Sequence, residues 1–301
     1  MNDILDILSC PLCGRSLDRV SESLRCDNGH SFDIARSGYV NLLPPGKEKN
    51  ARSGDEREMV RARESFLSLG YYDSIADTLA GLVTEYSPDS CKSSCTVCDM
   101  GCGEGYHTCR TIERLSELCD GELLAVGFDA SKYAAERASK RAVREGLMPR
   151  DGVGAAHDKG AAAYFFPGNL FRLPLADSSV NVALSLFAPV AGDEAARILK
   201  NDGLLIVVSS GREHLLELRR RIYEDVRLSD ELPPVPSGFR ELGRRHSTEV
   251  VSIRTTEELR ALFTMTPFYY KTTEQGRERL FSSEMPFRLT VDVDYSIFGV
   301  L

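Results

Sequence analysis

Four residues near the start of the chain have the types and the spacing of a zinc site. They are Cys10, Cys13, Cys26 and His30, in the pattern C-x2-C-x12-C-x3-H. Thiolates and imidazole nitrogens are ligands that zinc prefers, and four protein ligands leave no open position for a substrate. Incidental buried cysteines are the competing interpretation, but two close pairs of ligands favour metal. The pattern therefore predicts structural zinc, which would supply much of the folding energy of a short module.

A basic, proline-containing segment at 36–52 follows this module. It contains Pro44-Pro45-Gly46 and Tyr39, and its Lys and Arg residues outnumber its single Glu. Composition alone favours a solvated connection. The alternative is a surface that binds RNA phosphates and stacks a base on the tyrosine ring.

A second group with chemical potential is a glycine-rich loop. A short apolar strand at 96–98 runs into Asp99, and the sequence continues as M-G-C-G-E-G before a helix at 106–118. Glycines such as Gly101 and Gly103 let the backbone turn sharply and approach a ligand closely. The spacing G-x-G-x-G differs from the G-x-G-x-x-G of dinucleotide-binding proteins.

The next strand narrows the choice of cofactor. An apolar run at 123–128 ends at Asp129, whose carboxylate is placed to accept hydrogen bonds from ribose hydroxyls. NAD enzymes and methyltransferases share this feature. The combination of D-x-G-C-G-E-G with G-x-D-x-S is typical of class I methyltransferases, so the sequence predicts S-adenosylmethionine (SAM) as the cofactor. We expect the glycine loop, Glu104 included, to contact it.

Two later strand ends complete the expected site. The strand at 163–167 ends before Asn169 and Leu170, which methyltransferases of this class present to the adenine. The strand at 180–186 ends at Phe187, Ala188 and Pro189, where the substrate and the methyl donor meet. Ligands of open α/β sheets bind at the carboxyl ends of the strands, so these residues should lie together.

The elements that position these residues alternate between strands and helices. This order predicts an α/β, Rossmann-like class I methyltransferase fold, a doubly wound and mostly parallel seven-stranded sheet, with a small N-terminal zinc-binding module. We expect the zinc-binding module at 1–45, a linker and helical bridge at 46–90, and the SAM-dependent methyltransferase domain at 91–301. Helices at 59–69 and 73–83 should pack on the sheet. Further strands are expected at 204–208, 250–253 and 289–293, and a local insertion at 152–163.

Composition excludes several other classes of protein. The chain has 301 residues, a formal net charge of −8 and nine cysteines. No apolar run approaches the ~20 residues that span a bilayer, so we expect no membrane partner. The odd number of cysteines and the acidic start of the chain favour reduced thiols in the cytoplasm. The negative charge argues against a protein that coats nucleic acid non-specifically, but not against a local basic patch.

Taken in order, these segments resemble one family, the bacterial 23S rRNA guanine-N1 methyltransferases, which include macrolide-resistance members. The resemblance covers nearly the whole chain. It rests on C-P-L-C with C-x3-H, F-D-x-A-x-x-G-Y-V-N-L-L-P at 32–44, D-x-G-C-G-E-G-Y at 99–106, Ala188-Pro189, H-L-x-E-L at 214–218 and M-T-P-F at 265–268.

The resemblance implies zinc at the four ligands named above and a homodimer. It implies that Tyr72 and His214 contact SAM, together with the glycine loop, Asp129 and the Asn169-Leu170 pair. It also implies that the substrate is a guanine in 23S rRNA. Guanine N1 lies on the Watson–Crick edge and carries a proton at neutral pH, so the target must be unpaired or extruded and must lose that proton. The sequence identifies no residue as the base.

Three other interpretations remain open at this stage. A class I methyltransferase acting on a small molecule could use the zinc module as a lid or for dimerisation. A non-catalytic RNA-binding protein could sense the cofactor without turning it over. An NAD-dependent oxidoreductase is disfavoured by the spacing of the glycine loop.

Overall fold

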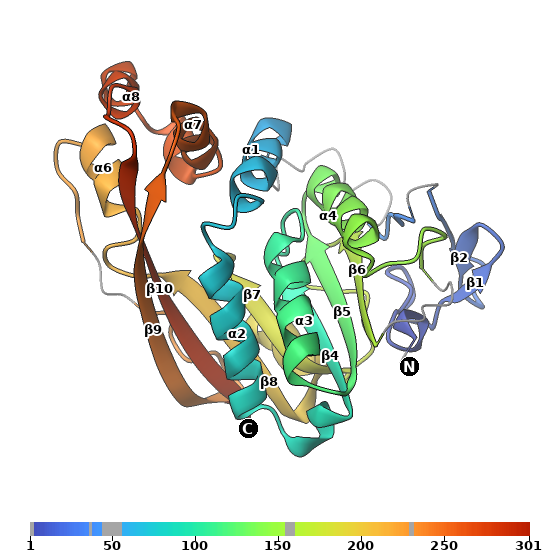
Figure 1. Cartoon of the computed structure of the whole chain (residues 1–301). Helices are drawn as coiled ribbons and strands as arrows, with labels where there is room; N and C mark the ends of the chain where they lie inside the picture. The colour runs from blue at the N-terminus through green and yellow to red at the C-terminus, as the bar shows by residue number, and fades with distance from the viewer. Residues whose placement is uncertain (1–2, 36–37, 44–55, 154–159, 229–231) are drawn as a thin grey trace.

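The computed structural model describes residues 3–35, 38–43, 56–153, 160–228 and 232–301 (Figure 1). The strands are β1 (Asp18–Val20), β2 (Ser23–Arg25), β3 (Ser31–Asp33), β4 (Ser94–Met100), β5 (Glu122–Asp129), β6 (Ala161–Pro167), β7 (Val180–Leu186), β8 (Leu199–Ser210), β9 (Phe239–Ile253) and β10 (Phe287–Val300). The helices are α1 (Arg57–Leu67), α2 (Asp73–Tyr86), α3 (Tyr106–Leu118), α4 (Lys132–Glu145), α5 (Gly192–Ile198), α6 (Leu216–Ile222), α7 (Thr256–Thr264) and α8 (Glu274–Phe281), with short 3-10 turns η1 (Ile4–Asp6), η3 (Asp89–Lys92) and η4 (Pro267–Tyr270).

The main sheet has seven strands in the order β6-β5-β4-β7-β8-β10-β9. The pairs from β6 to β8 are parallel, and β10 is antiparallel to both of its neighbours. Every residue of β6 and β7 is buried, as is expected for parallel strands covered on both faces. The predicted class I methyltransferase fold, with a mostly parallel seven-stranded sheet, is confirmed.

The two helices that precede the sheet differ in their packing. α2 covers the face of the sheet that is turned to the viewer in Figure 1, beside α3 and α4. Ser74 on α2 donates to Glu249 of β9 at 2.5 Å. α1 instead contacts α7 and α4 above the carboxyl edge of the sheet, where Arg63 donates to the Met265 carbonyl at 3.4 Å. The prediction that α1 packs on the sheet is therefore wrong.

β9 is much longer than the predicted strand at 250–253. Most of its side chains between Arg240 and Val250 are exposed or half-buried, so no apolar run marks the strand in the sequence. Its backbone is paired with β10 along the whole length, from Phe239 opposite Val300 to Ile253 opposite Phe287. Hydrogen bonding to a buried neighbour, rather than side-chain burial, fixes this edge strand.

The zinc-binding module docks on the connection between β6 and β7. The Ser9 N–H donates to the Pro174 carbonyl at 2.9 Å, and the Ala176 N–H donates to the Ile7 carbonyl at 2.9 Å. Residues 168–179 form no helix, and module residues such as Leu8 and Leu17 belong to the same buried cluster as the core of the sheet. The module therefore packs where a connecting helix is usual, and the two cores are continuous.

Parts of two expected segments lie outside the described residues. They are residues 36–37 and 44–52 of the basic connection and residues 154–159 of the expected insertion. Among the helices of the described ranges, none combines the length and the apolar character that a membrane span requires.

Candidate active site

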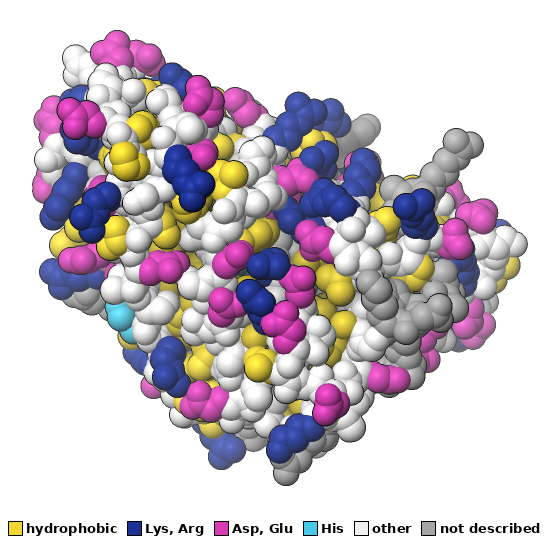
Figure 2. Space-filling model, in the orientation of Figure 1, with side chains coloured by type: hydrophobic (Ala, Val, Ile, Leu, Met, Phe, Trp, Pro, Cys, Tyr) yellow, Lys and Arg dark blue, Asp and Glu magenta, His cyan; other side chains and the backbone are white. Residues whose placement is uncertain are grey.

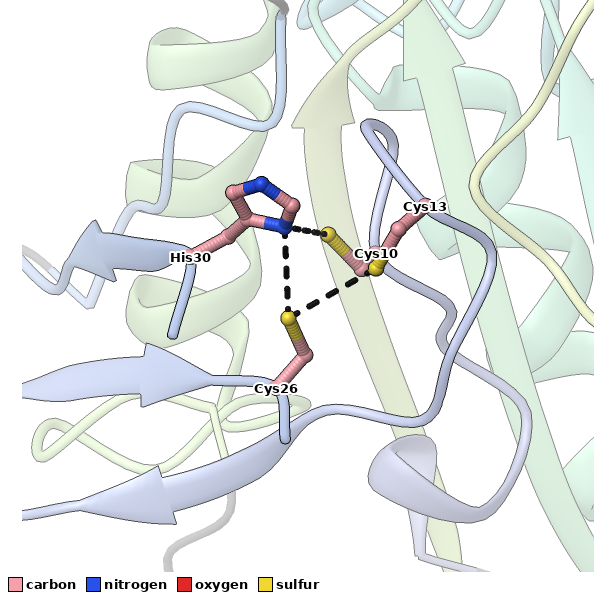
Figure 3. A group of neighbouring side chains, drawn as sticks. All are labelled: Cys10, Cys13, Cys26 and His30. Carbon is pink, nitrogen blue, oxygen red and sulfur yellow. Dashed lines mark hydrogen bonds between the residues drawn. The ribbon is translucent and has the colours of Figure 1, made fainter. Parts of the chain in front are cut away.

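The four predicted metal ligands converge on one point (Figure 3). Their ligating atoms, from Cys10, Cys13, Cys26 and His30, all lie within 4.8 Å of one another. Two turns aim them: Gly14 and Gly29 adopt φ of 74° and 80°, directly beside a ligand, which a side chain would strain. A backbone N–H of Arg15 lowers the pKa of the Cys13 thiol to about 6, which favours the thiolate that binds metal.

The distances between these atoms fit tetrahedral zinc. Bonds of about 2.3 Å to sulfur and about 2.0 Å to nitrogen place two sulfurs about 3.8 Å apart and a sulfur and a nitrogen about 3.5 Å apart. The Cys13 and Cys26 sulfurs are 3.7 Å apart, and His30 Nδ1 is 3.5 Å and 3.4 Å from the Cys10 and Cys26 sulfurs. The Nδ1 atom of His30 is therefore the nitrogen ligand.

A cleft of about 2580 Å³ runs along the carboxyl ends of the parallel strands. All residues that the sequence assigns to the cofactor or the substrate line it: Tyr72, Asp99, Gly101, Gly103, Glu104, Asp129, Asn169, Leu170, Phe187, Ala188, Pro189 and His214. The zinc module contributes Ser9 to Pro11, Gly14, Leu42 and Leu43 to the same wall. One cleft thus joins the module to the methyltransferase motifs.

Glycine is required at two positions of the loop that follows β4. Gly101 has φ of 106°, and a Cβ there would lie 2.6 Å from the Ala188 Cβ. Gly105 has φ of 83°, and a Cβ there would lie 2.8 Å from the Ala138 Cβ. The loop therefore passes close to both the Ala188 segment and α4, and its backbone faces the cleft.

Asp129, at the end of β5, holds the loop and the next helix together. Its Oδ2 accepts from the Gly103 N–H at 3.0 Å, and its Oδ1 accepts from the Ser131 N–H at 2.7 Å. Each carboxylate oxygen can accept more than one hydrogen bond. The carboxylate lies in the cleft wall at the carboxyl end of a parallel strand, where a ligand's ribose hydroxyls can reach it.

Asp99 is buried at the end of β4. Its Oδ2 accepts from the Thr108 hydroxyl at 2.5 Å, whereas Oδ1 has no partner among the described residues. Burial raises the pKa of this carboxyl group to about 7, against the opposing hydrogen bond from Thr108. A buried polar atom without a partner, in the wall of a cleft, is suited to a polar group of a ligand.

Glu104 is engaged within the protein. Its carboxylate pairs with the buried guanidinium of Arg141, with a closest distance of 2.8 Å, and Arg141 also donates to the Ser68 hydroxyl at 3.1 Å. This ion pair ties the glycine loop to α4 and to the end of α1. Glu104 would therefore contact a cofactor through its backbone atoms.

Tyr72, Phe187 and His214 form an aromatic group on one wall. The Phe187 and His214 rings stack with centroids 5.8 Å apart, and the Tyr72 hydroxyl lies 3.5 Å from His214 Nε2. Phe187 is 42% exposed and adopts a φ of 52°, which is costly for a non-glycine residue and is typical of functional sites. Its exposed ring is a platform on which a planar base can stack.

The protonation state of His214 is set by its neighbours. Its Nδ1 accepts from the Asp292 N–H at 3.3 Å, so the neutral ring carries its proton on Nε2. Burial lowers the pKa of His214 to about 4, and the ring is neutral at pH 7. His214 therefore presents a hydrogen-bond donor, rather than a base, towards Tyr72 and the cleft.

Two cleft residues were missed by sequence reasoning. His107 lies between Tyr72 and Phe187, its Nδ1 is buried without a partner among the described residues, and burial lowers its pKa to about 4. Arg63 has its guanidinium nitrogen 3.6 Å from the Cβ position of Gly103. The position of His107, directly after G-E-G-Y, was the available signal. Arg63 belongs to the Ala62-Arg63 pair that also contributes to the family resemblance, but that resemblance gave it no role.

Comparison with known protein families accounts for both parts of the chain. Residues 8–52 match the zinc-ribbon family described as "RlmA, N-terminal", and residues 98–207 match the family described as "Methyltransferase domain". A protein of Streptomyces fradiae named 23S rRNA (guanine(748)-N(1))-methyltransferase is 34% identical over 239 residues, which cover 77% of this chain and 76% of the relative. The chain belongs to the 23S rRNA (guanine-N1)-methyltransferase family.

Two further relatives carry the same family name, each as a candidate member. One from Micromonospora griseorubida is 36% identical over 253 residues, which cover 76% of this chain and 77% of the relative. Another, from Bacillus subtilis (strain 168), is 35% identical over 220 residues, with coverages of 72% and 68%. The methyltransferase domain uses SAM, and the module is a zinc ribbon with a Cys3His ligand set.

The cleft of this family member fits SAM. The glycine loop leaves room for a ligand to approach the backbone, and Asp129 lies in the wall of the cleft at the carboxyl end of β5. The unpartnered atoms of Asp99 and His107 offer partners for the polar groups of the cofactor. When bound, SAM supplies an electrophilic methyl group, and the cleft residues orient it and exclude water.

The raised pKa of Asp99 predicts a pH-dependent stability. Between about pH 4 and about pH 7 the native carboxyl group holds a proton that the unfolded chain has lost, so stability falls as pH rises across this range and levels off above it. We expect the free energy of unfolding of the cofactor-free protein, relative to an Asp99→Asn variant, to fall by roughly 3 kcal/mol over this range. Urea unfolding of both proteins measures the difference between their free energies of unfolding. The contributions of the histidines are the same in both proteins and cancel in this difference. A pH-independent difference would show that Asp99 is ionised throughout.

Proposed function

We propose that this protein transfers the methyl group of SAM to N1 of a guanine in 23S rRNA. The observation that carries the proposal is the single cleft shared by the zinc ribbon and the SAM-binding motifs. A small substrate would need only the methyltransferase part of this wall. A cleft that extends from the glycine loop to Cys10 and Leu43 suits a polymer substrate. The names of the relatives agree with this substrate.

The proposal gives each predicted residue a role. Asp129 binds the ribose of SAM, Asn169 and Leu170 hold the adenine, and the loop from Asp99 to Glu104 borders the methionine part. Tyr72 and His214, which are neighbours in the cleft wall, contact the cofactor, with the His214 Nε2–H as donor. Arg63, beside the loop, has the charge to hold the methionine carboxylate.

The target base binds at Phe187, Ala188 and Pro189 in this proposal. Guanine N1 is reached only when the nucleotide is unpaired or extruded, and an exposed aromatic ring can then stack on the base. As the N1–C bond forms, the S–C bond breaks with its electron pair going to sulfur. The N1 proton must pass to an acceptor, and the protonated Nε2 of neutral His214 is not suited to receive it.

The zinc ribbon holds the RNA in this proposal, while the α/β domain carries out the chemistry. The corresponding units are residues 1–45, the connection and bridge at 46–90, and the methyltransferase domain at 91–301. We also propose a cytoplasmic location, which agrees with action on ribosomal RNA. We also propose a homodimer, as the resemblance to the family implies.

Primer extension tests the proposed reaction. The purified protein is incubated with SAM and unmodified 23S rRNA, and reverse transcription is then run across the RNA. Methylation at guanine N1 blocks base pairing, so we expect a new SAM-dependent stop one nucleotide before a single guanine. Assembled large subunits are the second substrate to be tested.

The outcomes separate the remaining alternatives. Methyl transfer without any RNA would favour a small-molecule substrate. Tight SAM binding with no stop on naked rRNA or on assembled subunits would contradict the proposed enzyme and favour a cofactor-sensing RNA-binding protein. A stop that requires SAM excludes both.

A further inference from the structure

Two arginines and one tyrosine form a stack at the rim of the cleft, outside the residues assigned to SAM or the target base. Arg57 and Arg61 are one helical turn apart on α1, and Tyr133 is in the first turn of α4. The guanidinium carbons lie 5.5 Å and 5.9 Å from the centre of the tyrosine ring. Arg61 also donates from Nε to the Tyr133 hydroxyl at 2.9 Å. Two cationic side chains are thereby held on one aromatic ring.

Among the described residues, no carboxylate neutralises the charges of this stack. Both arginines are exposed, and within the described part of the chain neither forms an ion pair with a carboxylate. Like charges four residues apart on a helix destabilise it slightly. The nearby acidic residues on α1 are directed elsewhere: Glu58 accepts from Tyr269 at 3.4 Å, and Glu64 pairs with Arg137. An external anion would compensate the two charges.

The stack borders the expected path of a polymer into the cleft. Arg57 and Tyr133 line the cleft, together with Lys132, which begins α4 three residues after Asp129. Figure 2 shows Lys and Arg side chains gathered over α1 and α4, on a molecule whose net charge is −8. Glu56 is an acidic, exposed residue in the same wall. Other Lys and Arg side chains are scattered over the same face, but this group lies beside the cleft (Figure 2).

We propose that Arg57, Arg61 and Tyr133 form a docking site for the phosphate backbone of the RNA strand that flanks the target nucleotide. The proposal rests on the proposed function, because it concerns the same substrate at the rim of the same cleft. A guanidinium matches the geometry of phosphate oxygens with paired donors. The tyrosine ring holds both guanidinium groups in place, which reduces the entropy lost on binding. Phosphate contacts fix the position of the RNA and carry no sequence information.

The salt dependence of RNA binding tests this site. The variant carries Arg57→Gln and Arg61→Gln, and the probes are 23S and 16S rRNA transcripts. We expect the slope of log K against log salt to become shallower by about 2, one unit for each lost phosphate contact. Between about 50 mM and about 200 mM salt, the original protein should then lose about tenfold more affinity than the variant. The change should be equal for both transcripts, because the site reads phosphates.

Two further variants separate charge from packing. Arg57→Lys with Arg61→Lys keeps both charges, and we expect it to retain most of the slope. Arg240→Ala is the matched control, because Arg240 is an exposed arginine of β9 at the edge of the sheet away from the cleft. It should leave the slope unchanged. An unchanged slope in the glutamine pair would overturn the proposal. If the melting temperature of that variant also falls, the stack serves only to join α1 to α4.

The methylation assay keeps this proposal distinct from the proposed function. In the glutamine pair we expect the KM for RNA to rise and kcat to fall little, because the contact lies beside the reacting base. If the original protein produces no SAM-dependent stop on 23S rRNA, the proposed function fails. If it produces the stop and the glutamine pair keeps the original slope, only the docking site fails.

Discussion

Replacement of Cys13 by serine is expected to remove zinc from the protein and to reduce methylation of 23S rRNA by at least about 100-fold, while SAM still binds. Structural zinc contributes about 10–16 kcal/mol to the folding of isolated zinc-binding peptides. The ribbon has three strands of three residues each, so little else stabilises it. The residues proposed to hold SAM lie outside the ribbon, between Arg63 and His214 in the chain.

Three measurements test this prediction. Metal analysis measures the zinc content, calorimetric titration measures SAM binding, and primer extension measures methylation. The SAM titration is run well below the melting temperature, because the ribbon and the sheet share one core and the variant will be less stable overall. Cys119→Ser is the control: this half-buried cysteine ends α3 and lies outside the metal cluster. Full methylation by a zinc-free protein would contradict a role of the ribbon in binding RNA.

Replacement of Asp129 by alanine is expected to weaken SAM binding by roughly 100- to 1000-fold. Hydrogen bonds to a charged group contribute about 1.5–3 kcal/mol each, and the ribose offers two hydroxyls. The substitution also removes the acceptor of the Gly103 and Ser131 N–H groups, so the glycine loop loses an anchor. Both effects act on the cofactor, and saturating SAM should restore part of the activity.

Calorimetric titration with SAM measures this loss. Asp120→Ala removes the same charge at an exposed position beyond the far end of α3 and should leave the affinity unchanged. Asp129→Asn keeps the shape of the side chain, and its affinity for SAM should lie between those of Asp129→Ala and Asp120→Ala. An affinity of Asp129→Ala within threefold of the original would exclude Asp129 as the ribose ligand.

Elements with a strong local pattern could be predicted closely from the sequence. The helix predicted at 106–118 is α3 to the residue, and the strand predicted at 180–186 is β7. α3 begins directly after Gly105, and β7 begins where two serines give way to an apolar run. Only residues 250–253 of β9 were predicted, because the rest of this edge strand has polar side chains on both sides of the chain and no hydrophobic signal.

The zinc ligands, the glycine loop and Asp129 could be predicted from the sequence alone as candidate site residues, because each prediction depends on residues that are near one another in the chain. A thiolate pair in a tight turn, or an acidic residue after an apolar strand, has the same local geometry in any context that keeps the turn. The family resemblance added Tyr72 and His214 to the list. It could not say how they are arranged.

The tertiary structure decided everything that depends on contacts between distant segments. The ribbon reaches the cleft because Ser9 and Ile7 pair with the connection near Pro174, and the proton of His214 is fixed by the backbone of Asp292. Arg61 meets Tyr133 only because α1 packs beside α4. Such contacts are stabilised by burial and hydrogen bonding summed over the whole fold, so no local pattern records them. The chemistry was therefore visible in the sequence, whereas the surface that receives the substrate was not.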